Sequence, residues 1–131
     1  FFLELLKTEK YSAIGRMMKV SHNGDRLGVA HATNAYLEQL VQENIPFGKV
    51  SGSYNCSTGE IDYLCDLLNA MDGVLGSELV GAGLGGCVIA LVEKDKADAV
   101  IDAVNKGYYD KYSLPHAANV YTASSKSSVI Y

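Results

Sequence analysis

The sequence predicts an α+β fold with a small antiparallel sheet, helices packed on one face and extra N-terminal helices, in a ferredoxin-like split β-α-β arrangement. Residues 73–80 and 87–92 form two apolar runs that read as strands, the second rich in β-branched residues. A cluster of glycines joins the two runs, and segments with helical spacing of apolar residues lie before and after them. The sequence contains no internal repeat. We therefore expect a single domain over residues 1–131.

Composition restricts the classes of function. The chain has 131 residues, of which 48% are hydrophobic and 20% charged, the usual balance of a globular domain with a buried core. A net charge of −4 with scattered basic residues gives no footprint for nucleic acid. No apolar run approaches the ~18 residues of a membrane span, and no signal peptide pattern is present. We expect no nucleic-acid or membrane partner and a cytoplasmic location, which the odd number of cysteines also favours.

Two short helices are expected at the N-terminus. Helical spacing predicts the first around Leu5 and a second through Ala13 to Met18, with Thr8 as the N-cap of the second. The polar segment 21–26 then ends the second helix, with Gly24 as a left-handed stop. From the residues alone this segment is a helix C-cap in which His22 meets the negative end of the helix dipole. A ligand-facing cluster is the alternative.

Two further helices are expected before the sheet. Apolar stripes predict one over about residues 31–43 and another whose buried face carries Ile61, Leu64, Cys65 and Leu68. Between them lies a loop rich in glycine and serine, and Ser57 with Glu60 fits a capping box at the start of the second helix. Cys65 is expected in the core, and Cys87, at the start of a strand, is also expected to be buried.

The C-terminal part is expected to return to the sheet. A helix is predicted from Ala97 to about Tyr112, because its apolar residues line one face and Pro115 follows. Residues 119–123 read as a third strand, and residues 129–131 as a short edge strand.

The glycine cluster is the strongest candidate for a site. Gly81, Gly83, Gly85 and Gly86 are more glycines than a hairpin turn requires. Such a bare backbone indicates positive φ angles or close approach, and suggests N–H groups that face an anion. The letters also satisfy G-x-G-x-x-G, but a strand follows where a dinucleotide-binding motif needs a helix, and no Walker motif is present. A purely structural hairpin loop is the alternative.

With this loop placed between strands, the chain resembles the C-terminal domain of the GHMP kinases, a group of small-molecule kinases. Three segments carry the resemblance, in the family's order: Met17-Met18-Lys19-Val20-Ser21-His22, Tyr54-Asn55-Cys56-Ser57-Thr58-Gly59-Glu60-Ile61-Asp62 and Gly81-Ala82-Gly83-Leu84-Gly85-Gly86-Cys87. The first two resemble galactokinases in particular. Gly59 stands where the family usually has proline, Leu84 replaces a common phenylalanine, and the stretch between Gly28 and Ser53 is longer than usual.

The resemblance implies a C-terminal lobe of an ATP-dependent sugar kinase. It implies nucleotide or substrate contacts by the four glycines and by Ser21, His22 and Arg26, with Arg26 facing either the phosphates or a neighbouring acidic group. ATP and Mg²⁺ are the implied cofactors, bound mainly by an N-terminal kinase domain that also holds the catalytic aspartate. In this chain we expect no catalytic residue and no metal ligand.

Two other functions stay open from the sequence. One is a stand-alone ACT-like module that binds a small regulatory ligand, and the other is a different GHMP kinase, such as a mevalonate kinase. The chain begins with Phe1 instead of Met, from which we expect a piece of a longer protein.

Overall fold

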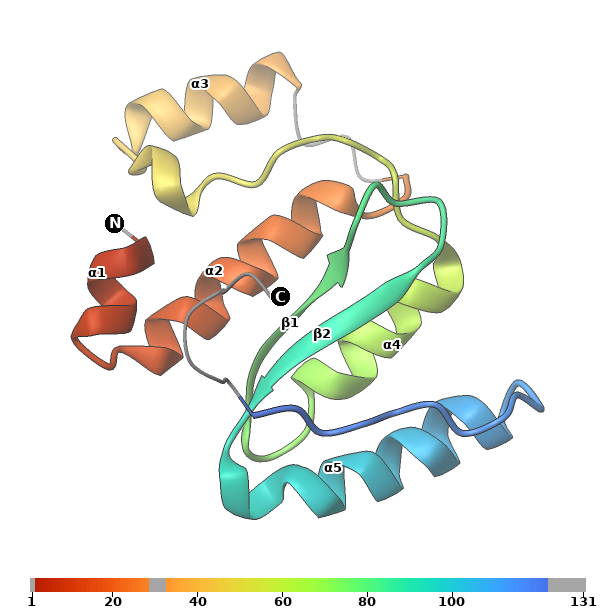
Figure 1. Cartoon of the computed structure of the whole chain (residues 1–131). Coiled ribbons are helices and arrows are strands. Elements are labelled where there is room, and N and C mark those ends of the chain that lie inside the picture. The colour runs from red at the N-terminus through yellow and green to blue at the C-terminus, as the bar shows by residue number, and fades with distance from the viewer. Residues whose placement is uncertain (1, 29–32, 123–131) are drawn as a thin grey trace, which may run out of the picture.

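A computed structural model of the chain describes residues 2–28 and 33–122 and has an α+β fold (Figure 1). Its helices are α1 (Phe2–Lys7), α2 (Tyr11–Asp25), α3 (Asn34–Gln42), α4 (Gly59–Asn69) and α5 (Ala97–Val104). Its strands are β1 (Val74–Val80) and β2 (Cys87–Val92). The predicted α+β class is therefore confirmed, including the extra N-terminal helices.

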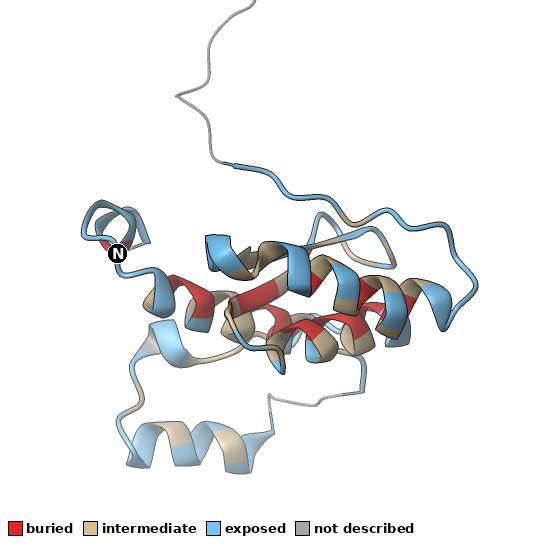
Figure 2. Ribbon diagram, turned by 90° about the horizontal axis from the view of Figure 1, so that it is seen from below, coloured by how far each residue is buried: buried red, intermediate tan, exposed pale blue. Residues whose placement is uncertain are grey.

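The two strands pair antiparallel, with Val80 opposite Cys87 next to the glycine cluster and a register shift between Val74 and Gly76. The run α4–β1–β2–α5 follows the central part of the predicted split β-α-β arrangement. Helices α4 and α5 pack on the sheet, and their contact forms the main core, made of Leu64, Leu68, Val74, Val100, Val104 and Tyr108. Figure 2 shows the buried residues gathered where the helices meet the strands.

Helix α2 lies along β1 at very short range. A Cβ on Gly15 would collide with the backbone of Leu75, and one on Gly76 would collide with the backbone of Gly15. Glycine at both positions therefore lets helix and strand backbones touch. This contact fixes α2 along β1, so that its C-terminal end lies at the same end of the molecule as the glycine cluster (Figure 1).

The limits of the first two helices differ from the prediction. The Thr8 hydroxyl donates to the Glu4 carbonyl at the end of α1, and does not cap α2, which begins at Tyr11. Gly24 does not stop α2 either, because the helix continues to Asp25. Gly24 is buried instead, and a Cβ there would collide with the backbone of Gly52. Glycine is needed at this position for close contact with the 52–57 segment, and not for a left-handed turn.

Helix α3 lies apart from the sheet and has no buried residue (Figure 1). It begins after Thr33, whose side chain accepts a hydrogen bond from the Tyr36 N–H. The predicted helix over residues 31–43 is thus present in a shorter form. Because its apolar stripe has no buried member, α3 adds little to the core.

The cap of α4 is one residue later than predicted. Thr58, not Ser57, is the N-cap, and its side chain accepts from the Ile61 N–H at 3.3 Å. Ser57 is buried just before the helix. Cys65 lies in the core as predicted, with no exposed surface.

The C-terminal part is partly as predicted. Helix α5 continues as a π-helical turn over Asn105–Asp110, close to the predicted length. Residues 119–122 form no strand, since no neighbouring strand pairs with them and pairing is what stabilises a strand; residues 123 and 129–131 lie outside the described residues. Cys87 starts β2, but it is exposed and not buried, because alternation along this strand turns it away from α4.

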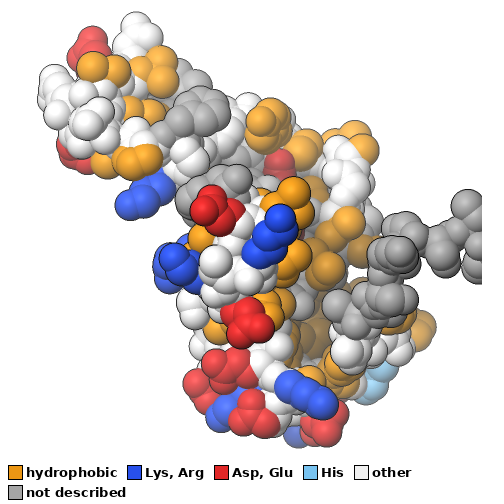
Figure 3. All heavy atoms as spheres, turned by 60° about the vertical axis from the view of Figure 1, so that its left-hand side comes forward, with side chains coloured by type: hydrophobic (Ala, Val, Ile, Leu, Met, Phe, Trp, Pro, Cys, Tyr) orange, Lys and Arg blue, Asp and Glu red, His pale blue; other side chains and the backbone are white. Residues whose placement is uncertain are grey.

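Charged side chains are interspersed on the surface, with apolar side chains exposed between them (Figure 3). No helix among residues 2–28 and 33–122 has the length and apolar character needed to cross a membrane.

Candidate functional site

The candidate site is the loop of residues 81–86 between β1 and β2, called the glycine loop below. Its φ angles are +100° at Gly81, +87° at Gly83, +118° at Gly85 and +111° at Gly86. Leu84 also has a positive φ, +63°. Glycine adopts these angles without the steric cost that a Cβ brings. The backbone geometry expected from the glycine cluster is therefore present.

The outer side of the glycine loop is open. A Cβ at Gly81 or Gly85 would have no atom within 4 Å, and the Leu84 side chain is 84% exposed. Apart from chain neighbours, the space where a side chain would stand is therefore open at these two glycines in the described part of the chain. A turn that contains left-handed residues is one form of backbone in which successive N–H groups are brought together around an anion.

The inner side of the glycine loop rests on Cys56. The Leu84 N–H donates a hydrogen bond to the Cys56 carbonyl. At Gly83, a Cβ would collide with that same carbonyl oxygen. Gly83 therefore lets the loop lie directly on the segment that precedes α4.

Cys56 is held in turn by the C-terminal end of α2. The Asp25 carbonyl accepts hydrogen bonds from the Cys56 N–H (2.9 Å) and the Ser57 N–H (2.8 Å), and the Gly24 carbonyl accepts one from the Tyr54 N–H (2.7 Å). The Cys56 thiol also donates to Asp25 Oδ1 at 3.5 Å. These bonds satisfy carbonyl groups that would otherwise lack partners at a helix end. They connect α2 to the glycine loop through backbone atoms.

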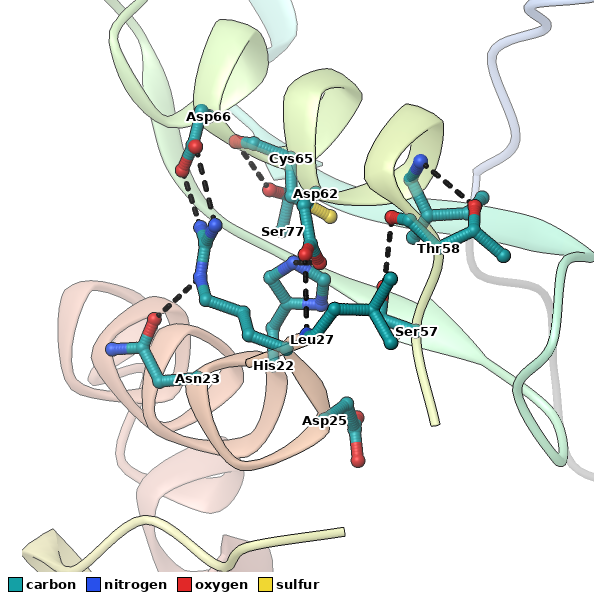
Figure 4. Close-up of polar contacts among 12 residues, drawn as sticks. His22, Asn23, Asp25, Leu27, Ser57, Thr58, Asp62, Cys65, Asp66 and Ser77 are labelled. Carbon is teal, nitrogen blue, oxygen red and sulfur yellow. Dashed lines mark hydrogen bonds and ion pairs between the residues drawn. The ribbon is translucent and has the colours of Figure 1, made fainter. Parts of the chain in front are cut away.

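A polar cluster joins α2 to α4 beside this connection (Figure 4). His22 Nε2 lies 3.4 Å from Asp62 Oδ1, and Asp62 Oδ2 accepts from the Leu27 N–H at 3.3 Å. Arg26 donates to both carboxylate oxygens of Asp66, one of them at 3.1 Å. This forked contact uses the geometry in which guanidinium and carboxylate fit best.

The surroundings of this cluster shift the pKa values of His22 and Arg26 in opposite directions. Burial lowers the pKa of His22, and Arg26 lowers it further, whereas Asp62, Asp25 and Asp66 act in the opposite direction. His22 is therefore neutral at neutral pH. The hydrogen bond to Asp66 raises the pKa of Arg26.

The thiol of Cys65 lies next to this cluster on α4. Burial raises its pKa to about 11, so it stays protonated and is a poor nucleophile. Its backbone carbonyl accepts a hydrogen bond from the Ser77 hydroxyl of β1 at 3.2 Å. Cys65 thus helps to join α4 to the sheet.

The structure brings the two sets of predicted site residues to one end of the molecule. The four glycines share the loop, and Ser21, His22 and Arg26 lie in and just after the last turns of α2. Ser21 is exposed and lowers the pKa of Glu78 of β1, against the effect of burial; His22 is 1% exposed and Arg26 binds Asp66. Of the two partners expected for Arg26, phosphate or an acidic group, the described structure contains the acidic one.

Sequence reasoning missed the contacts that support the loop. Asp62 and Asp66 lie one turn apart on α4, and this spacing is the signal that both carboxylates share a face. The backbone contacts of Asp25 with Cys56 had no signal in the sequence, because a carbonyl group is common to every residue.

Two further features bear on ligands. Among residues 2–28 and 33–122, no group of three or more His, Cys, Asp or Glu side chains is placed to hold a metal ion. A hollow of about 610 Å³ is open and lies at the other end of the sheet, near Tyr11, Leu75 and Leu91. It shares no residue with the glycine loop, and we do not assign it to the site.

Residues 2–110 match the model of the family described as "GHMP kinases C terminal". The chain belongs to this family. The glycine loop, the end of α2 and the start of α4 all lie within the matched residues. The family expected from the sequence motifs is therefore confirmed.

The similar proteins are named galactokinases. This GHMP kinase chain is 30% identical over 122 residues to "Galactokinase" of Exiguobacterium sibiricum, covering 93% of this chain and 24% of the relative. It is 32% identical over 119 residues to that of Staphylococcus saprophyticus, covering 83% and 31%. To that of Dictyostelium discoideum it is 45% identical over 62 residues, covering 47% and 12%. The chain thus spans less than a third of the length of these relatives.

Proposed function

We propose that this chain is the C-terminal domain of an ATP-dependent sugar kinase of the galactokinase type. In this proposal the glycine loop lines the active-site cleft beside the phosphates of ATP. The observation that carries the proposal is the glycine loop itself, with its left-handed backbone angles and open backbone at Gly81 and Gly85. The similarity to proteins named galactokinases supports a sugar as acceptor over mevalonate.

The proposed chemistry suits a loop without functional side chains. Phosphoryl transfer is catalysed mainly by positioning and by stabilising charge on the transferred group. Backbone N–H donors fixed by the fold stabilise such charge at little cost in reorganisation. Within this chain, Gly81 and Gly85 are therefore the residues proposed to contact phosphate oxygens. Gly83 and Gly86 are proposed to shape the loop that holds them.

The remaining parts of the site are proposed to come from an N-terminal domain. The relatives are several times longer than the matching segment, which leaves room for a nucleotide-binding domain and a catalytic aspartate. The metal that neutralises phosphate charge is proposed to bind mainly to that other domain, as the family resemblance implies. The cytoplasmic location expected from the sequence stays a prediction.

The test measures ADP release from ATP with galactose and related sugars. The whole protein that carries this domain should phosphorylate a sugar at a rate typical of enzymes, about 1 per second or faster. The 131-residue chain alone should show no turnover, because the nucleotide-binding domain and the catalytic aspartate are proposed to lie outside it. Comparable turnover by the isolated chain would show that the proposed position of the active site is wrong. A whole protein that acts only on mevalonate would exclude a sugar as the acceptor.

A further inference from the structure

The contact between His22 and Asp62 has an unusual feature. His22 is 1% exposed between α2 and α4, and Asp62 Oδ1 lies 3.4 Å from its Nε2 atom (Figure 4). Among the described residues, neither ring nitrogen of His22 nor Asp62 Oδ1 has a hydrogen-bond partner of normal geometry. Buried polar atoms in this state lower stability, and an apolar side chain of similar size would avoid that cost. A polar pair at this position therefore calls for a functional explanation.

Asp62 contacts the end of α2 on both sides of Asp25. One carboxylate oxygen faces His22 in the last turn, and the other accepts the Leu27 N–H just beyond the helix. One turn further along α4, Asp66 binds Arg26. The residues from His22 to Leu27 are therefore held on α4 at three points.

Asp25 lies inside this held segment and leads to the glycine loop. Its carbonyl accepts the N–H groups of Cys56 and Ser57, and the Cys56 carbonyl accepts the Leu84 N–H. These hydrogen bonds join backbone atoms, so rotation of a side chain cannot compensate when one partner moves. A displacement of the end of α2 therefore moves Cys56 and, with it, the glycine loop.

We propose that His22 and Asp62 are a positioning pair that sets the place of the glycine loop through Asp25 and Cys56. The inference rests on the function proposed above, in which that loop faces phosphate. It gives His22 a role through the loop, in place of the direct ligand contact that the family resemblance implied.

The first experiment follows amide hydrogen exchange in the whole protein. His22→Leu removes both ring nitrogens while keeping an apolar side chain at a buried position. We expect the Leu84 and Cys56 amides to exchange faster than in the wild type, and amides of α5 to be unchanged. His22→Gln, which keeps an N–H donor, should restore slow exchange. This measurement does not depend on kinase activity.

The second experiment measures kinetics with ATP and galactose. If the loop is displaced by about 1 Å, His22→Leu should lower kcat and kcat/KM together by about 10²-fold, with KM for galactose little changed. His22→Gln should recover most of that loss. The matched control is His116→Gln, since His116 forms an exposed pair with Asp110 at 2.8 Å and takes part in none of the contacts described above for the glycine loop. The control should keep wild-type kinetics.

The outcomes separate the two proposals. If His22→Leu melts at a lower temperature but keeps wild-type exchange at Leu84 and wild-type kcat, the pair is structural only and the inference is overturned. If His22→Leu does not fold, Asp62→Asn replaces it, because asparagine keeps the size and an acceptor for Leu27; unchanged Leu84 exchange there also overturns the inference. If the wild-type protein phosphorylates no sugar, the proposed function fails, and the exchange result still decides whether the pair positions the loop.

Discussion

Gly83 is the residue at which the glycine loop meets the rest of the molecule. Its left-handed backbone and its contact with the Cys56 carbonyl both exclude a side chain. Gly81 and Gly85 share the left-handed backbone but face open space. The loop thus has an inner glycine that sets its position and outer glycines that leave the backbone accessible.

Gly83→Val in the whole protein should damage catalysis more than folding. A β-branched residue at a positive φ costs about 1–3 kcal/mol, and its Cβ would push the loop off Cys56. Under the proposed function, the displaced N–H groups would no longer meet the phosphates, and we therefore expect kcat/KM to fall by about 10²-fold. The measurement compares kcat/KM with the melting temperature.

Gly48→Val is the matched control for Gly83→Val. Gly48 is exposed, has no left-handed φ and has no atom within 4 Å of a Cβ position, so both quantities should stay near wild type. If Gly83→Val lost stability while each folded molecule kept normal activity, the loop would be only a structural hairpin.

His22 should make stability depend on pH in the acid range. Burial lowers its pKa in the folded protein, so between about 6.5 and that lower value the unfolded chain binds a proton that the folded chain does not. Stability should therefore fall as pH falls through this window, by at most about 1.4 kcal/mol per pH unit for one group. Melting curves at pH 7.5 and 5.5 test this: the loss should be smaller in His22→Gln, and an equal loss in both would contradict the assignment.

At the scale of elements, α2 and α4 together carry the support of the site. The end of α2 and the start of α4 enclose the 52–57 segment, and both helices contact β1, which leads into the glycine loop. The start of α4 is therefore important for the site as well as for the core.

Thr58→Ala should lower the free energy of unfolding by about 1 kcal/mol, because it removes the cap that accepts the Ile61 N–H. Thr33→Ala is the matched control, since Thr33 caps α3 by the same kind of bond. Because α3 has no buried residue, its fraying should leave global stability almost unchanged. Denaturant unfolding of both variants measures the difference, and equal losses would show that α3 is part of the cooperative unit.

The sequence predicted most helices and both strands, because apolar spacing and glycine clusters are local signals. It placed Gly24 as a helix stop and Ser57 as a cap, where the structure has a buried close contact and a cap one residue later. These errors have a common cause: the role of a glycine or serine depends on what packs against it. The third strand predicted over residues 119–123 is wrong over its described part, 119–122, for the same reason, since strand propensity forms no strand without a partner.

For the whole molecule, the residues of the candidate site could be named from the sequence, but not the contacts that join them. The glycine loop and the α2 segment with Ser21 and His22 were both identified from motifs. The link between them passes through Asp25 and Cys56, which are 31 residues apart and join mainly by backbone atoms. No pattern of side chains encodes such a bond, so only the folded chain shows it.

The contacts between the end of α2 and the segment before α4 also determine how the fold tolerates a change in the length of the stretch between them. The stretch that carries α3 begins and ends at residues already bound to each other, because the Gly28 N–H donates to Asn55 Oδ1 at 2.8 Å and the Tyr54 N–H donates to the Gly24 carbonyl. For a loop whose ends are fixed by contacts outside it, length enters only through closure entropy, about 0.6 kcal/mol per doubling.

Replacing residues 34–46 with a short Gly-Ser linker should therefore leave the melting temperature within a few degrees of wild type and leave the kinetics of the proposed sugar kinase reaction unchanged. Calorimetry and ADP release test this, and a large loss in either would show that α3 serves the site or the core. If the melting temperature and the kinetics are both kept, segments can be gained, lost or exchanged in evolution at residues 34–46, or inserted there by design. Such changes would not disturb the bonds that hold the glycine loop.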